Sequence, residues 1–396
     1  MTQVKAKFID TTVFPPRSGP AQPLIVANMT PQFLDGALAE MRRPSLWQPT
    51  FAMTEKRCNQ RLVYEEVCSP LAENLRSQIT TDNLDYHSII QRRLSVGRPA
   101  KIWELGQSEL FGRNGGAFKR GRLFLPSMGE MEVGFYGLER YVLSRLKPGL
   151  AKRKLGSVLS LHYRFDQVYF HALHDVFTAL PWLKKLGMDL PETIVVSERL
   201  AETTAGRAIL GSPWLREREV IVQKRNEVFC CEKLYVVRPP MFEGPLLSEV
   251  SEAIADEGIE RPPDQKVVLV RNQNVKNKRH CELYDEFSEM LAKVGYRKVN
   301  PADLSLEEQK KLFRSSKHIV AENGSGLTNM IFCQPGSCKV DLVIPDYWVT
   351  PTYPALAAAL GLDLSAHLVS SVDRGSNRNA VLDRETIEAI VGNSIC

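Results

Sequence analysis

Short apolar runs alternate with helix-like segments along the C-terminal part of the chain. Residues 266–271 (KVVLVR) form a β-branched run, which predicts a buried strand. The next segment repeats apolar residues at the spacing of one helix face: Leu283, Phe287, Leu291 and Val294. Gly295 follows at the position where glycine commonly ends a helix. The pattern therefore predicts a strand followed by an amphipathic helix.

The same alternation continues through the rest of this half. Short apolar runs predict three further strands, at residues 296–299, 318–321 and 339–344. Ser305 and Glu308 have the spacing of a capping box, which predicts that a helix begins there. An alanine-rich helix is predicted over residues 353–360, ended by Gly361. Strands and helices that alternate with short connections indicate an α/β fold with a parallel, doubly wound sheet.

The N-terminal half has a weaker pattern. Apolar runs predict strands at residues 194–196 and 220–222. Helix-like spacing predicts helices over residues 136–146 and 168–180. These elements suggest a second α/β unit over residues 150–245, preceded by a less regular region.

Two proline-rich turns, at residues 238–240 and 261–263, separate these unlike halves. We therefore predict an N-terminal domain over residues 1–245, of which residues 1–150 are hard to assign. A C-terminal domain is predicted over residues 246–396. The last helix of the C-terminal domain is expected to pack back on the N-terminal domain.

Composition and charge exclude several classes of protein. The 396 residues suit two domains of roughly 100–200 residues each. The 51 lysines and arginines against 46 aspartates and glutamates give a net charge of +5, which is too mild for a dedicated nucleic-acid binder. No apolar run approaches the roughly 18 residues of a membrane span. Because the N-terminus also lacks the order of a signal peptide, we expect a cytoplasmic protein.

The eight cysteines are expected to be reduced in that compartment. Their spacing does not match a zinc site. Cys230 and Cys231 are adjacent, and Cys333 and Cys338 have no second pair or histidine nearby in the sequence. The cysteine pattern therefore predicts no metal site.

A glycine-rich turn follows the strand predicted at residues 318–321. The residues of this turn are Glu322, Asn323, Gly324, Ser325, Gly326, Leu327, Thr328 and Asn329. Its two glycines let the backbone approach a ligand closely, and the helix expected from Leu327 offers unpaired N–H groups and the positive end of a dipole. These properties favour phosphate binding. The turn is neither a Walker loop nor a dinucleotide fingerprint, so a simple tight turn stays open as the alternative.

Arg271 ends the first strand of this unit and is expected to point to the same crevice. Ligands of open α/β sheets bind beyond the carboxyl ends of the strands. Lys278 and Arg279 follow in the next loop. An arginine can bridge two phosphate oxygens with its planar fork. The combination predicts a diphosphate site, whereas a surface salt bridge is the alternative role for Arg271.

From residue 271 to residue 361 the sequence resembles glycosyltransferase family 61. The resemblance is carried by Arg271, Arg279 with Glu282, residues 305–309, residues 322–329, Pro335 with Gly336, and Asp341. Upstream, residues 169–175 (YFHALHD) are similar to a helix of the family. Three positions depart from the family pattern: Asn323 in place of a histidine, Cys281 in place of an asparagine, and residues 177–180 in place of Leu-Pro-Arg-Leu.

The resemblance implies a GT-B-like fold, with two Rossmann-like domains that face a central cleft. It implies an inverting hexosyl or pentosyl transferase of polysaccharide biosynthesis, which moves a sugar from a nucleotide-sugar donor to a hydroxyl of a glycan, polysaccharide or lipid-linked acceptor. The C-terminal domain then binds the donor, and the N-terminal domain lies on the acceptor side. The expected donor-binding residues are Arg271, Arg279, Glu282, Asn323, Gly324, Ser325, Gly326, Leu327, Thr328 and Asn329. The departure at Asn323 keeps a catalytically silent nucleotide-sugar or glycan-binding protein as the alternative.

Inverting transfer requires a base that takes the proton of the acceptor hydroxyl. His171 and Asp175 are four residues apart on a predicted helix, so the carboxylate can orient the imidazole. We predict His171 as the base or as a ligand of the acceptor, with Asp175 as its orienting partner or as the base itself. Glu322 is a rival base, with binding of the acceptor as its alternative role. The structural alternative is a hydrogen-bonded histidine between the domains. The sequence contains no Asp-x-Asp triplet, which favours a reaction without a metal or another cofactor.

Residues 136–154 combine apolar positions with a run of arginines and lysines. A basic amphipathic helix can lie on an anionic membrane face, which suits a lipid-linked acceptor. The alternative is an ordinary helix with a solvated face. This segment therefore raises the hypothesis of peripheral contact with the inner face of the membrane, and no nucleic-acid partner is expected.

Overall fold

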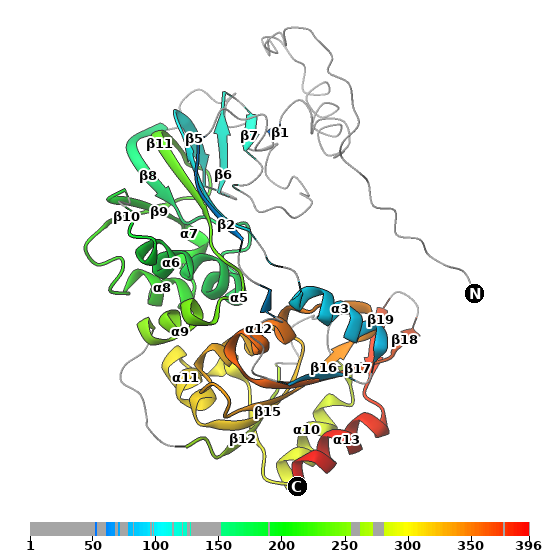
Figure 1. The fold of residues 1–396 in the computed structure, drawn as a ribbon. Coiled ribbons are helices and arrows are strands. Elements are labelled where there is room, and N and C mark those ends of the chain that lie inside the picture. Colours follow the sequence, from blue (N-terminus) through cyan, green and yellow to red (C-terminus); the bar gives the residue numbers. More distant parts are fainter. Residues whose placement is uncertain are drawn as a thin grey trace, which may run out of the picture.

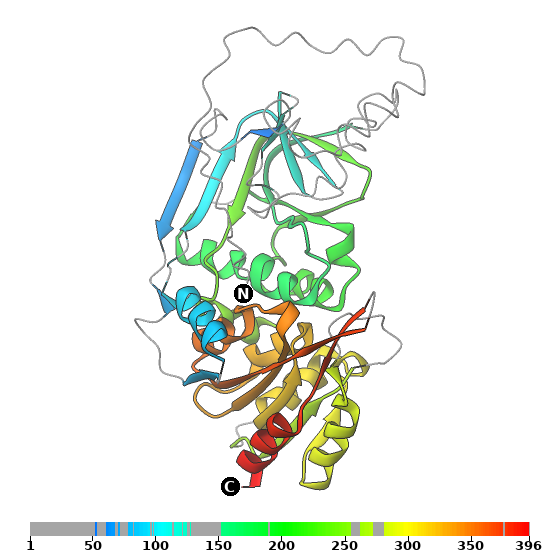
Figure 2. The ribbon, with the colours of Figure 1, turned by 90° about the vertical axis from the view of Figure 1, so that its right-hand side faces the viewer.

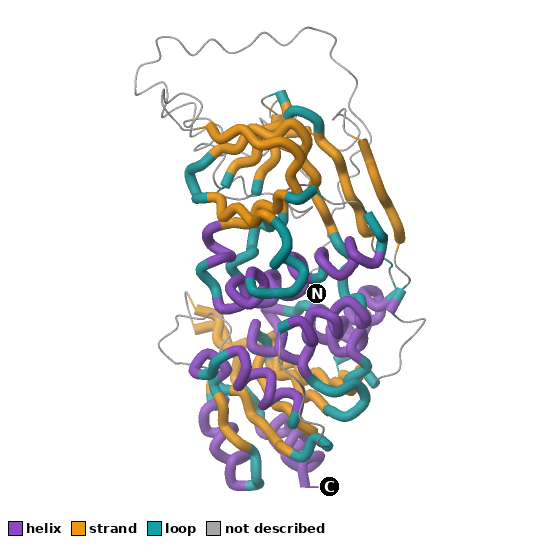
Figure 3. Tube along the Cα trace, turned by 90° about the vertical axis from the view of Figure 1, so that its left-hand side faces the viewer, coloured by secondary structure: helices purple, strands orange, loops and turns teal. Residues whose placement is uncertain are grey.

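The computed structural model describes residues 52–53, 61–67, 70–71, 78–81, 83–95, 97, 99–112, 115–120, 122–124, 127, 152–188, 191–254, 262–271, 281–374 and 377–395. These residues form two large β-sheets with helices packed between them (Figure 1). In Figure 3 the purple helices separate two groups of orange strands. The combination confirms the predicted α/β class. No helix in the described part of the chain is both long and apolar enough to span a bilayer.

The described part of the C-terminal sheet has six strands, and every pair is parallel. All four strands predicted in this half are present. In spatial order the strands are β14 (Arg297–Val299), β12 (Gln265–Leu269), β15 (Ser316–Glu322), β16 (Lys339–Pro345), β17 (Asp363–Val369) and β3 (Ile79–Thr81). Their apolar runs, such as KVDLVIP in β16, are typical of a parallel sheet that is covered on both faces.

The helices of this half begin and end where local signals predict. Ser305 Oγ accepts a hydrogen bond from Glu308 N, and the Glu308 carboxylate accepts one from Ser305 N, which is the predicted capping box. Gly295 and Gly361 have φ angles of +95° and +67°, which suit glycine at the end of a helix. The helices are α10 (Tyr284–Lys293), α11 (Leu306–Arg314), the 3₁₀-helix η6 (Ser325–Phe332), α12 (Thr352–Leu360) and α13 (Arg384–Ile395).

The last helix, α13, covers the C-terminal sheet beside α10 (Figure 1). Ile390 of α13 is fully buried and shares an apolar cluster with Phe287 and Leu291 of α10 and with Val320 and Val343 of the sheet. This position differs from the expectation that the last helix packs back on the N-terminal domain. The physical reason is that the apolar side of α13 completes the cover of the C-terminal sheet.

The N-terminal sheet has ten described strands and is mixed. Its parallel part contains both strands predicted in this half and consists of β8 (Lys152–Ser160), β9 (Thr193–Ser197), β10 (Glu219–Gln223) and β11 (Val228–Arg238). The other strands are β1 (Ala52–Met53), β2 (Arg61–Val67), β4 (Pro99–Leu105), β5 (Ser108–Phe111), β6 (Gly116–Lys119) and β7 (Arg122–Phe124). Among the pairings of these six strands, only the one between β1 and β7 is parallel. The antiparallel strands set this sheet apart from the purely parallel sheet of a Rossmann domain.

The helix predicted over residues 168–180 is present but irregular. It consists of α5 (Tyr169–His171), the π-helix η4 (Ala172–Phe177) and α6 (Ala179–Lys185). A π-helical turn inside a helix is rare and frequently marks a functional site. The helix predicted over residues 136–146 lies outside the described residues.

A segment of the predicted N-terminal domain belongs to the C-terminal sheet. Strand β3 pairs with β17, and α3 (Leu84–Leu94) lies beside α12 (Figure 2). Tyr86 Oη donates to the carbonyl of Thr350 at 2.8 Å, and Gln78 N donates to Asp363 Oδ1 at 2.7 Å. The chain therefore crosses between the two sheets more than once.

An apolar cluster fills the layer between the two sheets. It includes Phe170 and Leu173 from the N-terminal half together with Leu327 and Leu356 from the C-terminal half. Because both halves contribute to one core, the helices of this layer are held in register with the loops of both sheets.

Candidate active site

The strand order of the C-terminal sheet reverses between β12 and β15. The chain forms β12, places β14 on one side of it, and continues on the other side with β15, β16 and β17. In open α/β sheets this switch point opens a crevice beyond the carboxyl ends of the two strands, where ligands bind. Arg271 follows β12, and the turn at residues 322–329 starts at the end of β15. The two predicted phosphate-binding features therefore meet at the switch point.

Arg271 lies directly over the turn. Its Nη2 donates a hydrogen bond to the carbonyl of Asn323. A Cβ on Gly324 would come within 1.7 Å of Arg271 Nη2, so the guanidinium occupies the space that a side chain would need. The backbone N–H of Asn323 donates to Val343 O at 2.9 Å and fixes the turn to β16. Glycine is thus required at position 324 for close approach of the arginine.

Three buried polar atoms of Arg271 and the turn have no hydrogen-bond partner among the described residues. They are Arg271 Nη1, Asn323 Nδ2 and Thr328 Oγ1. Burial of an unpaired polar group costs free energy, so most such groups in native proteins have a partner. All three atoms can donate to the oxygens of an anionic ligand. The chemistry of these donors suits a phosphate or diphosphate.

Asn329, at the end of the turn, joins the two halves of the molecule. Tyr169 Oη donates to Asn329 Oδ1 at 2.5 Å, and Asn329 Nδ2 donates to Gln309 Oε1 at 2.7 Å. Burial raises the pKa of Tyr169, which keeps its hydroxyl protonated as a donor. Both polar atoms of the Asn329 side chain therefore have hydrogen-bond partners within the protein. Asn329, which the sequence predicts to bind the donor, links Tyr169 to Gln309.

The other residues of the turn differ in exposure. Ser325 is exposed, and Gly326 is half-buried with Pro301 as its nearest neighbour. Leu327 is buried in the apolar layer between the sheets. The structure therefore brings Ser325 and Gly326 to the surface of the turn, whereas Leu327 anchors it.

Glu322 is buried at the end of β15, with 4% of its surface exposed. Its Oε1 accepts a hydrogen bond of 2.6 Å from Cys281 N in β13 (Cys281–Glu282), where Glu282 is half-buried. Burial and the neighbouring charge of Glu322 raise the pKa of the Cys281 thiol. Glu322 thus holds β13 against the end of β15. Arg279 lies outside the described residues.

Asp341, the last residue of the family pattern, is fully buried inside the sheet. It accepts hydrogen bonds from His318 Nε2 at 2.6 Å and from His367 Nε2 at 2.9 Å. Although burial opposes ionisation, these hydrogen bonds and the charges of the histidines hold the pKa of Asp341 well below its usual range. The arrangement cross-links β15, β16 and β17 and is a structural one.

The predicted pair of His171 and Asp175 is present. His171 Nδ1 lies 2.5 Å from Asp175 Oδ2. The Asp175 side chain is 8% exposed and that of His171 is 26% exposed. Burial alone would raise the pKa of Asp175, but hydrogen bonds from His171 and His174 lower it to about 2. An ionised carboxylate can only accept a hydrogen bond, so the proton of this contact lies on His171 Nδ1. With the proton there, Nε2 is the ring nitrogen that a neutral imidazole offers to a substrate proton.

Aromatic side chains frame His171. The ring centroids of Tyr163 and Phe165 each lie 5.4 Å from that of His171, and Phe170 lies at 5.3 Å. Rings on several sides restrict the rotation of the imidazole. The partial exposure of His171 is consistent with a base that a substrate can reach.

His174 is a residue that sequence reasoning missed. It is 1% exposed, and its Nδ1 lies 2.8 Å from Asp175 Oδ1. Its Nε2 accepts a hydrogen bond of 3.0 Å from Phe242 N. Asp175 is therefore shared by two histidines, one at each carboxylate oxygen.

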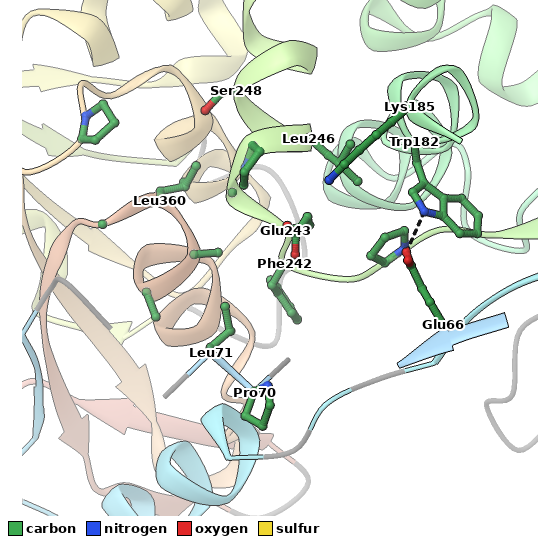
Figure 4. A pocket seen from close by; sticks show the side chains of 17 residues that line it. Glu66, Pro70, Leu71, Trp182, Lys185, Phe242, Glu243, Leu246, Ser248 and Leu360 are labelled. Atoms are coloured by element: carbon green, nitrogen blue, oxygen red, sulfur yellow. Dashed lines mark hydrogen bonds between the residues drawn. The ribbon is translucent and has the colours of Figure 1, made fainter. Parts of the chain in front are cut away.

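A cavity of about 600 Å³ lies elsewhere between the two halves (Figure 4). Its wall includes Trp182 and Lys185 of α6, Phe242, and the end of α12 at Leu360. Trp182 Nε1 donates to Glu66 Oε1 at 2.8 Å at one side of the cavity. Neither the turn at residues 322–329 nor the pair of His171 and Asp175 lines this cavity. No group of three or more histidine, cysteine or acidic side chains among the described residues is placed to hold a metal ion.

A parallel sheet whose switch point holds a turn with unpartnered buried donors, together with a helix that carries a His–Asp pair, is an arrangement suited to group transfer from a phosphorylated donor. Residues 169–340 match the family model of glycosyltransferase 61, which covers both the His171 helix and the turn. The predicted resemblance is confirmed, and the protein is a glycosyltransferase with a family 61 domain over these residues. No curated protein matches the chain at a significant level.

Proposed function

We propose that the protein is an inverting glycosyltransferase of the GT-B type, which uses a nucleotide-sugar donor and a hydroxyl of a glycan, polysaccharide or lipid-linked acceptor. The observation that carries the proposal is the set of three unpartnered buried donors at the switch point: Arg271 Nη1, Asn323 Nδ2 and Thr328 Oγ1. In this proposal they bind the diphosphate of the donor.

Departure of the nucleoside diphosphate leaves negative charge, which the enzyme has to stabilise. Arg271 supplies a fixed positive charge at the turn, and the unpartnered groups of Asn323 and Thr328 add hydrogen bonds. We assign charge neutralisation to these groups, together with Arg279, and propose that no divalent metal or other cofactor is required.

His171 is the proposed base. Its Nε2 takes the proton of the acceptor hydroxyl, while Asp175 holds the imidazole through Nδ1. A bond forms between the acceptor oxygen and the anomeric carbon, as the bond from that carbon to the diphosphate oxygen breaks and its electron pair leaves with the diphosphate. Attack from the face opposite the leaving group inverts the anomeric centre. Glu322 is a weaker candidate for the base, because it is buried and bonded to Cys281 N.

A thermal-shift screen with nucleoside diphosphates, followed by transfer and hydrolysis assays with a panel of nucleotide sugars, tests the proposal. A ligand that binds only the folded state raises the apparent stability. Stabilisation by at least one nucleoside diphosphate and inverted product from its sugar derivative are expected. Tight binding without turnover over a broad range of acceptors would favour the alternative, a catalytically silent nucleotide-sugar or glycan-binding protein, which the change to Asn323 motivates.

The proposed place of action is the cytoplasm, with peripheral contact at the inner face of the membrane. The support is the basic composition of residues 136–154 and a lipid-linked acceptor as one candidate substrate. Co-sedimentation of the protein with anionic and with neutral vesicles tests this part. Equal binding of the protein to both kinds of vesicle would contradict it.

A further inference from the structure

His174 occupies a position that the proposed reaction does not explain. It is almost fully buried between two hydrogen-bond partners, Asp175 on its Nδ1 side and the backbone N–H of Phe242 on its Nε2 side. A backbone N–H can only donate, so Nε2 must accept and the proton of the neutral ring must lie on Nδ1. His174 therefore donates to Asp175 Oδ1, while His171 donates to the other oxygen.

Phe242 is held in an unusual conformation at this contact. Its φ angle is +58°, in the left-handed region that a bulky residue rarely adopts. Its ring packs on His174 with a centroid distance of 4.4 Å, and the Arg93 guanidinium lies over the Phe242 ring, 4.6 Å from the ring centroid. Surrounding contacts thus fix the direction in which the Phe242 N–H points.

Phe242 also belongs to the segment that joins the two halves. Residues 239–243, here called the interdomain segment, run from β11 of the N-terminal sheet to α9 (Gly244–Ala253) in the layer between the sheets. Phe242 lines the cavity between the halves (Figure 4). A displacement of this segment would move the N–H that holds His174.

We propose that His174 is a positioning residue, which fixes the Asp175 carboxylate for His171 and ties it to the interdomain segment at Phe242. This inference rests on the proposed role of His171 as the base. A carboxylate held at both oxygens cannot rotate away from His171, so the imidazole keeps the tautomer that exposes the Nε2 lone pair. The relay from Phe242 through His174 and Asp175 makes the base responsive to the arrangement of the two halves.

Other charged and titratable groups face this cluster from neighbouring elements. Tyr163 is buried, and its pKa is raised by that burial and by the charge and a hydrogen bond of Asp175, while Arg238 and Arg164 act on it in the opposite direction. Tyr353 of α12 contacts Phe170 at a centroid distance of 6.1 Å. These groups stay unchanged in the variants below, so differences between the variants report on position 174.

Two substitutions separate the two hydrogen bonds of His174. The amide N–H of Asn lies close to the place of Nδ1, so His174→Asn can still donate to Asp175. The amide oxygen of Gln reaches the place of Nε2, so His174→Gln can still accept from Phe242 N. His174→Leu retains neither bond.

We expect kcat of His174→Asn to stay closest to that of the wild type. In His174→Gln and His174→Leu, kcat is expected to fall about tenfold or more, because a misoriented base loses part of its 10²–10⁴-fold contribution. The KM for the nucleotide sugar should not change. The acid limb of the kcat/KM profile should move to lower pH in both variants, because an Asp175 carboxylate that can rotate away from His171 stabilises protonated His171 less.

His318→Asn is the matched control, because His318 is also a buried histidine bonded to a carboxylate but lies away from the site. It should lower the thermal unfolding midpoint and leave the acid limb in place. The inference is overturned if His174→Gln retains wild-type kcat and pH profile, or if the position-174 variants, like the control, lose only stability. If His174→Leu does not fold, the comparison of His174→Asn with His174→Gln decides whether His174 positions Asp175.

Imidazole ¹⁵N–¹H spectra separate this inference from the proposed function. A wild-type protein that transfers no sugar contradicts the function, yet its spectra still show whether His174 carries its proton on Nδ1 between about pH 5 and 8. The expected result is an Nδ1–H tautomer for His174 and altered His171 signals in His174→Gln. An Nε2–H tautomer, or His171 signals that do not change, overturns the inference whatever the activity.

Discussion

Tyr169 Oη donates a hydrogen bond of 2.5 Å to Asn329 Oδ1. Tyr169 stands two residues before His171 on α5, and Asn329 lies in η6, which overlaps the turn at residues 322–329. Asn329 in turn donates to Gln309 of α11. The helix that carries the proposed base and the turn proposed to bind the donor are thus joined by one chain of hydrogen bonds.

Tyr169→Phe should loosen this connection. The substitution leaves Asn329 Oδ1 buried without its donor, so we expect the free energy of unfolding to fall by about 1–3 kcal/mol. Urea denaturation measures the change. A double-mutant cycle with Asn329→Ala should give a coupling energy of roughly 0.5–3 kcal/mol. Additive effects of the two substitutions would contradict a direct link.

Arg271→Ala should weaken binding of the nucleoside diphosphate. A hydrogen bond to a charged group contributes about 1.5–3 kcal/mol, which corresponds to roughly a 10- to 150-fold rise in Kd. Isothermal titration calorimetry with the nucleoside diphosphate found in the screen measures it. Arg297→Ala, at an exposed arginine of the same sheet, is the control and should leave Kd unchanged. Equal Kd values for Arg271→Ala and the wild type would remove Arg271 from the donor site.

Gly324→Ala should have a similar effect for a steric reason. Gly324 has φ −179°, an extended conformation open to any residue, so the backbone is not strained by alanine. The new Cβ would come within 1.7 Å of Arg271 Nη2 and displace the guanidinium. We expect the Kd for the nucleoside diphosphate to rise about tenfold or more, in line with the loss of a charged hydrogen bond.

Gly326→Ala is the matched control in the same turn. A Cβ at Gly326 meets Pro301 Cγ at 3.4 Å, which is ordinary contact. Its Kd should match that of the wild type. If both alanine variants bound the nucleoside diphosphate with equal Kd, the position of the Arg271 guanidinium against Gly324 would not matter for binding.

His171→Ala should separate chemistry from binding. Loss of a general base lowers kcat by about 10²–10⁴-fold, whereas affinity for the nucleoside diphosphate should persist because His171 does not contact the turn in this assignment. Glu322→Gln tests the rival base and should mainly lower stability, since Glu322 holds Cys281 N. Single-turnover assays with product analysis measure both variants. A fully active His171→Ala together with an inactive but folded Glu322→Gln would reverse the assignment.

The C-terminal half could be predicted because its signals are local. The capping box at Ser305 and the glycines at 295 and 361 act within one turn of their helices, and each was found where the sequence pattern indicated. The pairing of β3 with β17 could not be predicted, because it joins residues that are far apart in the sequence. Long-range pairing depends on packing, which local patterns do not encode.

The candidate site divides in the same way. Helical spacing predicted the contact of His171 with Asp175, but it gave no reason to pair Asp175 with His174. Adjacent residues of a regular helix point about 100° apart, and only the π-helical turn and the Phe242 N–H bring His174 into the cluster. The switch point likewise required the strand order, since Arg271 and Asn323 are 52 residues apart in the chain.

The stability of the protein at low pH should depend on Asp175. Burial opposes ionisation, but the hydrogen bonds from His171 and His174 lower its pKa from 3.8 to about 2. Because the folded-state value is the lower one, ionised Asp175 stabilises the fold above about pH 4, and this contribution is lost as the pH falls toward about 2. A shift of this size corresponds to roughly 2 kcal/mol.

Asp175→Asn removes this titration while Asp341, whose pKa is also lowered, is present in both proteins and cancels from the comparison. We expect the free energy of unfolding of the wild type to fall more steeply than that of Asp175→Asn between about pH 4 and 2. Urea denaturation at constant ionic strength across this range measures both curves. The slope is steeper because, as the pH falls, Asp175 takes up its proton in the unfolded wild type before it does so in the folded state. Parallel curves would mean that the two histidines do not lower the pKa of Asp175 in the folded protein.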